Sequence, residues 1–230
     1  GALARHRGWG CGRGFDGGTP LAESFREERN AARRRLWDRM EERDPGAGDC
    51  SLADVVGPDD QIGRWVGTRY AQQAIGEEPQ NVSVADVMAQ WEGGDDTVRE
   101  GYGTLVARSG QGLPITLDPP VRAIRWGSRG VAAETAKGTV KADRAVVTVP
   151  VGVLADGIRF DPALPATHRS ALDHLRGGAL TKVALALDGE RFDLPSPSDL
   201  FEIRSGFVFE CFPYDRDLVI ATIGGQPARD

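Results

Sequence analysis

The sequence predicts an α+β protein, with helices in its first half and strands in its second half. Two patterns lead to this class. Apolar residues recur at helical spacing over roughly the first hundred positions, whereas short β-rich runs punctuated by Pro and Gly follow Gly101. The chain has 230 residues, 40% of them hydrophobic and 27% charged, which is typical of a globular protein with a sizeable core.

The first half is expected to contain several helices after a short lead-in. Residues 1–20 are rich in Gly and Arg, and we expect them to be a flexible lead-in. Residues 21–113 are predicted to be mainly helical. The first helix should cover residues 21–43, because apolar side chains recur at spacings of four and seven: Leu21, Phe25, Ala32, Leu36 and Met40. Later helix starts are marked by capping residues: Ser51 with Asp54, Asp59 or Asp60, and Ser83 with Asp86.

The second half is expected to consist of strands and one further helix. Residues 114–150 should form a strand followed by a meander, from the runs Pro114–Leu117, Val121–Trp126, Gly130–Thr135 and Thr139–Val149. Within the last run, Ala145–Val149 is almost continuously apolar, which predicts a strand buried on both faces and ended by Pro150. Residues 151–230 should hold a helix within Pro162–Leu175 and then four strands: Leu180–Leu187, Leu200–Arg204, Phe207–Phe212 and Leu218–Ile223.

Composition argues against several classes of function. A net charge of −6 argues against a general nucleic-acid binder, and no apolar run reaches the roughly 18 residues that a membrane span requires. The cysteines are three in number and far apart, so neither a disulfide framework nor a metal site is predicted, and a reducing cytoplasmic setting is expected. His168 and His174 do not share a helix face, and no catalytic pairing is indicated.

A glycine motif near the start has the spacing G-x-G-x-x-G but lacks the preceding strand that such a motif requires. It runs from Gly12 to Gly17 and is preceded by Ala4–Trp9, which does not have the pattern of a buried strand. A dinucleotide-binding loop requires such a strand before the glycines and a helix after them. We therefore do not expect this segment to bind a pyrophosphate.

Lys182 stands in the middle of an apolar strand. Only three of the 28 basic residues are lysines, and Lys182 lies opposite the bulky face formed by Val183, Leu185 and Leu187, beside the small residues Ala184 and Ala186. Periodicity alone favours an exposed lysine on a half-buried strand. The alternative is a lysine that lines a cavity, where desolvation would favour its neutral amine and let it hold a water.

The tract around Lys182 resembles the flavin-containing amine oxidase family, which includes monoamine and polyamine oxidases, L-amino-acid oxidases and flavin histone demethylases. The resemblance covers about residues 95–192, through Gly101–Gly103, Val121–Ile124, Ala142–Asp143 with Val146–Leu154, Ile158–Pro165 and Gly177–Lys182. It implies the mixed sheet of an amine oxidase substrate domain, with residues 114–150 as a strand and meander of the FAD-binding domain. It also implies an internal portion of such an enzyme, without the N-terminal dinucleotide-binding motif or the C-terminal FAD segment.

The resemblance implies roles for four residues. Lys182 corresponds to the family's catalytic lysine, which holds a water near the flavin. Val121 corresponds to a valine whose backbone meets the adenosine part of FAD, and Val149 and Pro150 correspond to a strand end that lies along the same cofactor.

The implied reaction is oxidation of a primary or secondary amine, or an amino acid, to an imine. Hydride passes to FAD, and dioxygen reoxidises the flavin to give hydrogen peroxide. Two alternatives remain open: a non-catalytic remnant or binding module of the same fold, and a related flavoprotein of the desaturase or protoporphyrinogen-oxidase kind. The identity of the amine and the oligomeric state are not indicated by the sequence.

Overall fold

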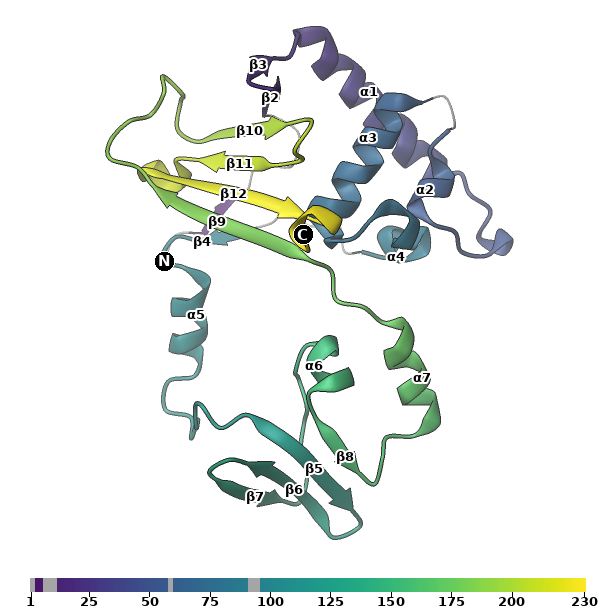
Figure 1. Ribbon diagram of the computed structural model, residues 1–230, viewed down its shortest axis with the longest axis vertical. Helices are drawn as coiled ribbons and strands as arrows, with labels where there is room; N and C mark the ends of the chain where they lie inside the picture. Colours follow the sequence, from purple (N-terminus) through teal and green to yellow (C-terminus); the bar gives the residue numbers. More distant parts are fainter. Residues whose placement is uncertain (1–2, 6–11, 58–59, 91–95) are drawn as a thin grey trace. The chain divides into compact units, whose positions relative to one another are not determined.

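A computed structural model describes residues 3–5, 12–57, 60–90 and 96–230 of the chain. The chain divides into two compact units, each with its own sheet (Figure 1). Unit 1 comprises Gly1–Leu105 and Gly178–Asp230, and unit 2 comprises Val106–Gly177. Helices and mixed sheets occur together, which confirms the predicted α+β class. No helix among the described residues is long and apolar enough to span a membrane.

The helices of unit 1 lie in the region predicted to be mainly helical. They are α1 (Glu23–Glu41), α2 (Leu52–Val55), α3 (Gln61–Tyr70), the π-helix η2 (Ala71–Ile75) and α4 (Val84–Met88). Ser51 and Asp54 form a capping box, and Asp60 and Ser83 cap α3 and α4, whereas Asp59 lies outside the described residues. Short 3-10 helices lie at Pro45–Ala47, Pro79–Asn81, Pro213–Asp215 and Gln226–Ala228.

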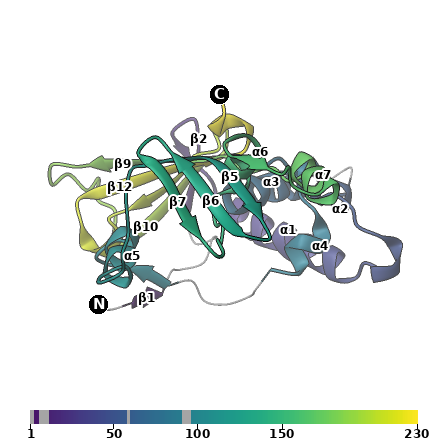
Figure 2. The ribbon, with the colours of Figure 1, turned by 90° about the horizontal axis from the view of Figure 1, so that it is seen from below.

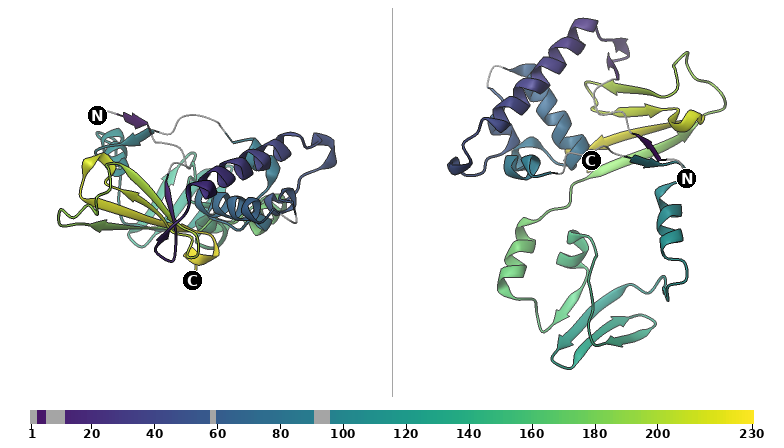
Figure 3. Two further views of the ribbon diagram at one scale, coloured as in Figure 1. Left: turned by 90° about the horizontal axis from the view of Figure 1, so that it is seen from above. Right: turned by 180° about the vertical axis from the view of Figure 1, so that it is seen from behind.

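The core of unit 1 forms where α1 packs on α3 and the shorter helices. Figure 3 shows α1 and α3 lying beside each other. From the predicted α1 stripe, Ala32, Leu36 and Met40 are buried, and they join Leu52 from α2 in the core. Burial of this apolar stripe, rather than helix propensity, supplies most of the stability of such helices.

A six-stranded sheet packs beside these helices, in the order β3-β2-β10-β11-β12-β9. Its strands are β2 (Arg13–Asp16), β3 (Thr19–Pro20), β9 (Leu180–Ala186), β10 (Ser198–Glu202), β11 (Val208–Cys211) and β12 (Leu218–Gly224). The last four confirm the strands predicted after residue 180. A separate antiparallel pair joins β1 (Leu3–Arg5) to β4 (Asp96–Val98).

The prediction of a flexible lead-in is wrong for residues 13–20, because they form β2 and β3 of this sheet. Gly14 lies so close to the Phe201 ring that a side-chain carbon there would overlap it. Asp16 also pairs with Arg204. Gly14, one of the glycines that suggested mobility, therefore permits close packing of β2 between β3 and β10.

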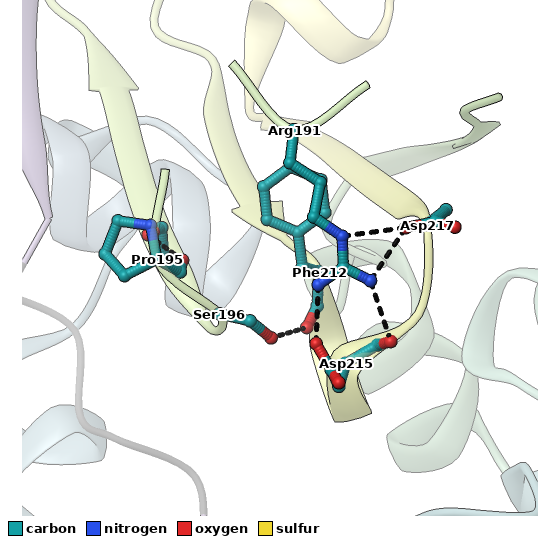
Figure 4. Close-up of polar contacts among 7 residues, drawn as sticks. Arg191, Pro195, Ser196, Phe212, Asp215 and Asp217 are labelled. Atoms are coloured by element: carbon teal, nitrogen blue, oxygen red, sulfur yellow. Dashed lines mark hydrogen bonds and ion pairs between the residues drawn. The ribbon is translucent and has the colours of Figure 1, made fainter. Parts of the chain in front are cut away.

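A cluster around Arg191 ties the connection after β9 to the turn between β11 and β12 (Figure 4). The Arg191 guanidinium bonds to the carboxylates of Asp215 and Asp217 and lies 5.1 Å from the centre of the Phe212 ring. Ser196 donates a hydrogen bond of 3.0 Å to the Phe212 carbonyl. These contacts hold one end of the sheet together.

Unit 2 contains a meander of three antiparallel strands (Figure 2), and a fourth strand is added to it in parallel (Figure 1). The strands are β5 (Val121–Gly127), β6 (Gly130–Thr135), β7 (Gly138–Ala142) and β8 (Arg159–Asp161), in the order β7-β6-β5-β8. Two helices, α6 (Val151–Asp156) and α7 (Ala166–His174), complete it, and α5 (Tyr102–Ser109) spans the boundary with unit 1.

Three expectations for this region are corrected. Pro114–Leu117 is not a strand, and the strand expected over Thr139–Val149 ends at Ala142. The Ala145–Val149 run is not a buried strand: Val146 is 89% exposed, because no strand of unit 2 pairs with it. Residues 151–177 group with the meander rather than with the later strands, since β8 pairs with β5.

Candidate functional site

Glycines allow the π-helix to lie against the ends of β9 and β12. A side-chain carbon on Gly178 would overlap the Ile75 carbonyl oxygen, and one on Gly224 would overlap that of Gln72. Gly76 ends the π-helix in the left-handed region, at φ 74°, and its carbonyl accepts a 2.7 Å hydrogen bond from Ala179. Only glycine permits both the approach and this turn. The packing places the π-helix beside the strand that carries Lys182.

A cavity of about 250 Å³ lies in unit 1 between these helices and the six-stranded sheet. Its walls come from α1, α3 and the π-helix on one side and from β9 to β12 on the other. The lining residues are Gly12, Arg29, Asn30, Arg33, Trp37, Trp65, Val66, Arg69, Tyr70, Gln73, Ala74, Lys182, Asp199, Leu200, Phe201, Val208, Glu210 and Thr222. The cavity is thus built from segments at both ends of the sequence.

Strand register explains which sheet residues reach the cavity. Lys182 lies opposite Thr222, and Thr222 lies opposite Val208. Val208 in turn lies opposite Phe201. Two residues further along, Glu210 lies opposite Asp199 on the same face. The prediction that Lys182 faces away from Val183 and Leu185 agrees with this register, because side chains alternate along a strand.

Aromatic rings form the apolar part of the wall. Trp37 and Tyr70 meet edge to face, with their centres 5.0 Å apart. Trp65 lies 5.7 Å from Phe201 and therefore links α3 to the sheet. Burial raises the pKa of the Tyr70 hydroxyl, with nearby Arg33 acting in the opposite direction. These rings can hold the hydrocarbon part of a ligand and keep water from it.

Arginines on the helix side of the cavity have partners in the protein. The Arg29 guanidinium lies 5.2 Å from the centre of the Phe201 ring, and that of Arg33 lies 5.8 Å from the Trp37 ring. Arg69 donates to the Gly206 carbonyl, which also accepts a 3.2 Å hydrogen bond from Gln73 Nε2. Burial lowers the pKa of Arg69 to about 10, although the charge of Glu202 opposes that shift.

Three buried polar atoms in the cavity wall have no hydrogen-bond partner among the described residues: Trp65 Nε1, Arg69 Nη2 and Gln73 Oε1. Their residues lie four apart along α3 and the π-helix, so they share one helix face. A buried polar atom without a partner costs about 1–3 kcal/mol. This face is therefore suited to a further polar group, such as an internal water or a ligand atom.

The structure places the four predicted site residues in different units. Lys182 lies on β9 in unit 1, where it lines the cavity with an exposed side chain. Val121 begins β5 in unit 2, with Thr135 opposite it. Val149 and Pro150 precede α6, and Pro150 is the residue before its first turn. The expected role of Pro150 in ending a strand ladder is not found, because no ladder reaches it.

The motifs that we set aside remain without a functional arrangement. Gly12–Gly17 is followed by a turn in which Gly17 and Gly18 have positive φ, not by a helix, and Arg13–Asp16 pairs with β10 at the edge of the sheet. His168 and His174 lie on α7 with exposed side chains. Among the described residues, no cluster of His, Cys, Asp or Glu could hold a metal ion.

Several lining residues were not identified from the sequence. Glu210 and Asp199 belong to the cavity. The Glu202 carboxylate instead accepts hydrogen bonds from the side chain and backbone of Ser205 and from the backbone of Gly17, which hold its pKa at about 2. Alternation along β10 separates Asp199 and Phe201 from Glu202, but it does not say which face meets the helices.

Comparison with protein families matches residues 22–230 to the model of flavin-containing amine oxidoreductases. The chain belongs to this family. Among curated relatives, Lysine-specific histone demethylase 1 homolog 1 of Oryza sativa subsp. japonica is 38% identical over 103 residues, covering 44% of this chain and 12% of that protein. Polyamine oxidase 4 of the same organism is 34% identical over 140 residues, covering 58% of this chain and 28% of that protein.

Solved structures of amine oxidases share the fold. Putrescine oxidase bound to putrescine matches with a TM-score of 0.72 and 17% identity, over 99% of this chain and 61% of that one. Cyclohexylamine oxidase from Brevibacterium oxydans IH-35A matches with a TM-score of 0.69 and 17% identity, over 99% and 60%. The chain therefore spans about three fifths of these proteins and at most about a quarter of the two curated relatives. These findings confirm the resemblance and the expected cofactor, since the family depends on FAD.

The backbone of residues 144–150 in unit 2 is suited to the contact with FAD that the resemblance implies for Val149 and Pro150. Residues 144–149 make no backbone hydrogen bond within unit 2, all of whose residues are described. An extended backbone with free N–H and C=O groups can follow a cofactor edge closely. Val149 and Pro150 would meet FAD there, and Val121 lies outside the β5–β8 pairing, which begins at Ala123. The Gly12–Gly17 segment does not fit a pyrophosphate, for the reason given above.

Proposed function

We propose that the cavity of unit 1 is the amine site of an FAD-dependent amine oxidase and that Lys182 is its catalytic lysine. The observation that carries this proposal is the position of Lys182, which projects from β9 into a cavity with aromatic walls in a chain of this family. Relatives named as a polyamine oxidase and a putrescine oxidase favour an aliphatic amine as substrate.

The chain's own residues have separable tasks in this proposal. Trp37, Tyr70 and Trp65 hold the carbon chain of the amine and exclude water from it. Lys182 carries only N–H donors when charged, and it gains an acceptor lone pair when neutral, so it can hold a water beside the substrate. When bound, FAD would supply the two-electron acceptor that oxidises the amine to an imine, with dioxygen as the final oxidant.

The test is substitution of Lys182 in the flavin-loaded protein that carries this chain. Lys182→Met should lower amine-dependent peroxide release by about a hundredfold or more, because a positioned proton-transfer group contributes that much. Lys141→Met on β7 is the matched control, since Lys141 is exposed in unit 2 and distant in sequence from the cavity segments. Full activity in Lys182→Met would contradict the role given to this residue.

Flavin content separates this proposal from the two alternatives. A protein that remains colourless after incubation with FAD and desalting would be a binding module or a remnant. A protein that retains flavin but releases no peroxide with any amine would fit a related flavoprotein, such as a desaturase. Only retained flavin absorbance together with amine-dependent peroxide supports the oxidase.

A further inference from the structure

We propose that Thr222 is a positioning residue for Lys182: its hydroxyl shares a water with the Lys182 amine and so holds that amine over the cavity. Thr222 lies on β12, the strand that pairs with β9. This inference rests on the proposed function, because it concerns how the lysine of the same site is held in place.

The first argument is that Thr222 is the hydrogen-bonding neighbour of Lys182 within the sheet. The two residues lie directly opposite each other, and both line the cavity. Residues paired in this way have Cβ atoms about 4.5–5.5 Å apart. Among the described strands, only β12 flanks β9, which is the edge of the sheet. The other neighbours of Lys182 on this face carry no hydrogen-bonding side chain: Leu180, Ala184, Ile220 and Gly224.

The second argument is that the Thr222 hydroxyl is buried and available. Thr222 is only 7% exposed, and among the described residues its hydroxyl has no hydrogen-bond partner. A buried hydroxyl without a partner is unfavourable, and a hydrogen bond to a water in the cavity removes that cost. The β-branched side chain also has a restricted first torsion, so the hydroxyl occupies a well-defined position.

The third argument is that the Lys182 amine needs such a partner. The Lys182 side chain is exposed, and the described residues give it neither a hydrogen bond nor an ion pair. A lysine has many rotamers, and fixing it in one of them costs conformational entropy. A group that acts at one position is therefore held by the packing or the hydrogen bonds of its neighbours. Ala184, next to Lys182 on the same face, is too small to hold the long side chain by packing.

A water fits between the two polar groups. Lys182 and Thr222 form no direct hydrogen bond. A water that bonds to both of them spans up to about 5.5 Å between the amine nitrogen and the hydroxyl oxygen. Because a hydroxyl can both donate and accept, it can bond this water whether the lysine is charged and donates or neutral and accepts. A valine side chain would fill the same volume and make neither bond.

The carboxylates of the sheet lie further from Lys182 than Thr222 does. Glu210 is two strands away from β9 and two residues further along the ladder. Strand geometry then gives roughly 12 Å between the Cα atoms of Lys182 and Glu210. Asp199 lies one strand beyond Glu210. Thr222 is therefore the polar side chain of the sheet that is best placed to orient the lysine.

The kinetic test removes the hydroxyl while keeping the volume of the side chain. In the flavin-loaded protein that carries this chain, Thr222→Val should lower kcat for amine oxidation by about three- to tenfold, as for one hydrogen bond, and change KM by less than about twofold. Thr222→Ser should keep most of the wild-type kcat. Thr181→Val is the matched control, since Thr181 precedes Lys182 on β9 and points to the other face of the sheet.

A double variant shows whether Thr222 acts through the lysine. Added to Lys182→Met, Thr222→Val should lower kcat no further, because the group that it positions is already absent. The inference is overturned by full kcat in Thr222→Val, by an equal loss in Thr222→Ser, or by a further loss in the double variant, with circular dichroism showing each variant folded.

Solvent exchange of the lysine ammonium protons tests the inference without any activity. With isotope-labelled lysine, the Lys182 signal in the magnetic resonance spectrum is the one that Lys182→Met removes, and the exposed Lys141 is identified in the same way. We expect Lys182 to exchange about three- to tenfold more slowly than Lys141 in the wild-type protein and in Thr222→Ser, and as fast as Lys141 in Thr222→Val. Equal exchange at both lysines of the wild-type protein would overturn the inference.

The two measurements keep this inference distinct from the proposed function. If Lys182→Met retains full activity while the exchange pattern holds, the catalytic role of Lys182 fails and its positioning by Thr222 stands. If Lys182→Met is inactive while Thr222→Val changes neither kcat nor exchange, the positioning role fails alone.

Discussion

The two units of this chain bury their apolar residues to very different extents. In unit 1, α1, α2 and α3 enclose a core in which Leu36 and Leu52 are at most 2% exposed. In unit 2, all of whose residues are described, the buried hydrophobic residues are Ala123 and Ile124 alone. The difference follows from coverage: helices pack over the sheet side of unit 1, whereas the meander of unit 2 has exposed strands such as β7.

This contrast explains why the cavity belongs to unit 1. A concave site with fixed side chains needs a rigid frame of packed elements around it. Unit 1 supplies that frame through its helix core, the close approach of the π-helix to β9 and β12, and the Arg191 cluster. Unit 2 instead presents apolar side chains and unpaired backbone, which suit contact with another surface or with a cofactor.

The largest expected effect tests the contrast in burial directly. Leu36→Ala should lower the free energy of unfolding by about 2–5 kcal/mol, because it leaves a cavity in the unit 1 core. Val146→Ala in unit 2 should change that energy by no more than about 0.5 kcal/mol, since the side chain is 89% exposed. Urea unfolding followed by circular dichroism measures both. A comparable loss in the two variants would show that unit 2 has an apolar core of its own.

A smaller change in stability is expected when a glycine of each unit is replaced by alanine. Gly224→Ala should destabilise the protein by about 1–3 kcal/mol, because the new methyl group overlaps the Gln72 carbonyl of the π-helix. Gly152→Ala in α6 is the matched control: its methyl group meets nothing within 4 Å, so a gain of about 0.5–1 kcal/mol is expected. Thermal unfolding reports both changes. If Gly224→Ala were neutral, the π-helix would not be held by this contact.

The smallest expected effect concerns acid stability. A hydrogen bond from Arg229, followed by others from the Glu78 backbone and Asn81, lowers the pKa of Glu77 to about 2. Because this pKa is depressed in the folded state, the stabilisation is present above the ordinary carboxylate value near 4.5 and is lost as the pH falls toward 2. Glu77→Gln should cost about 1 kcal/mol at pH 7 and flatten the loss of stability between about pH 5 and 2.

The control for this change lies in unit 2. Glu134 pairs with Arg125, whose side chain is 59% exposed, so Glu134→Gln should cost no more than about 0.5 kcal/mol. Unfolding free energies at pH 7, 5 and 3 would distinguish the two variants. An unchanged acid profile in Glu77→Gln would mean that other carboxylates determine the acid stability.

Local patterns predicted many elements correctly, for identifiable reasons. The capping residues Ser51, Asp60 and Ser83 marked helix starts, because their side chains satisfy N–H groups that the helix leaves free. Alternation along β9 placed Lys182 opposite Val183 and Leu185. Prediction failed for two segments. Residues 13–20 were expected to be flexible but form strands, and residues 145–149 were expected to be a buried strand but are not one. Their states depend on whether a partner strand is present, and that information is not local.

The sequence by itself determined the α+β class, most helix and strand positions and the family, and it singled out Lys182 as a candidate site residue, because these depend on local periodicity and on an ordered series of motifs. Only the tertiary structure decided that Lys182 shares a cavity with Glu210, Asp199 and Gln73. Gln73 and Glu210, for example, lie more than a hundred positions apart in the chain. Strand order and register, together with the docking of the π-helix on two glycines, bring them to one wall, and long-range packing of this kind leaves no short-range pattern in the sequence.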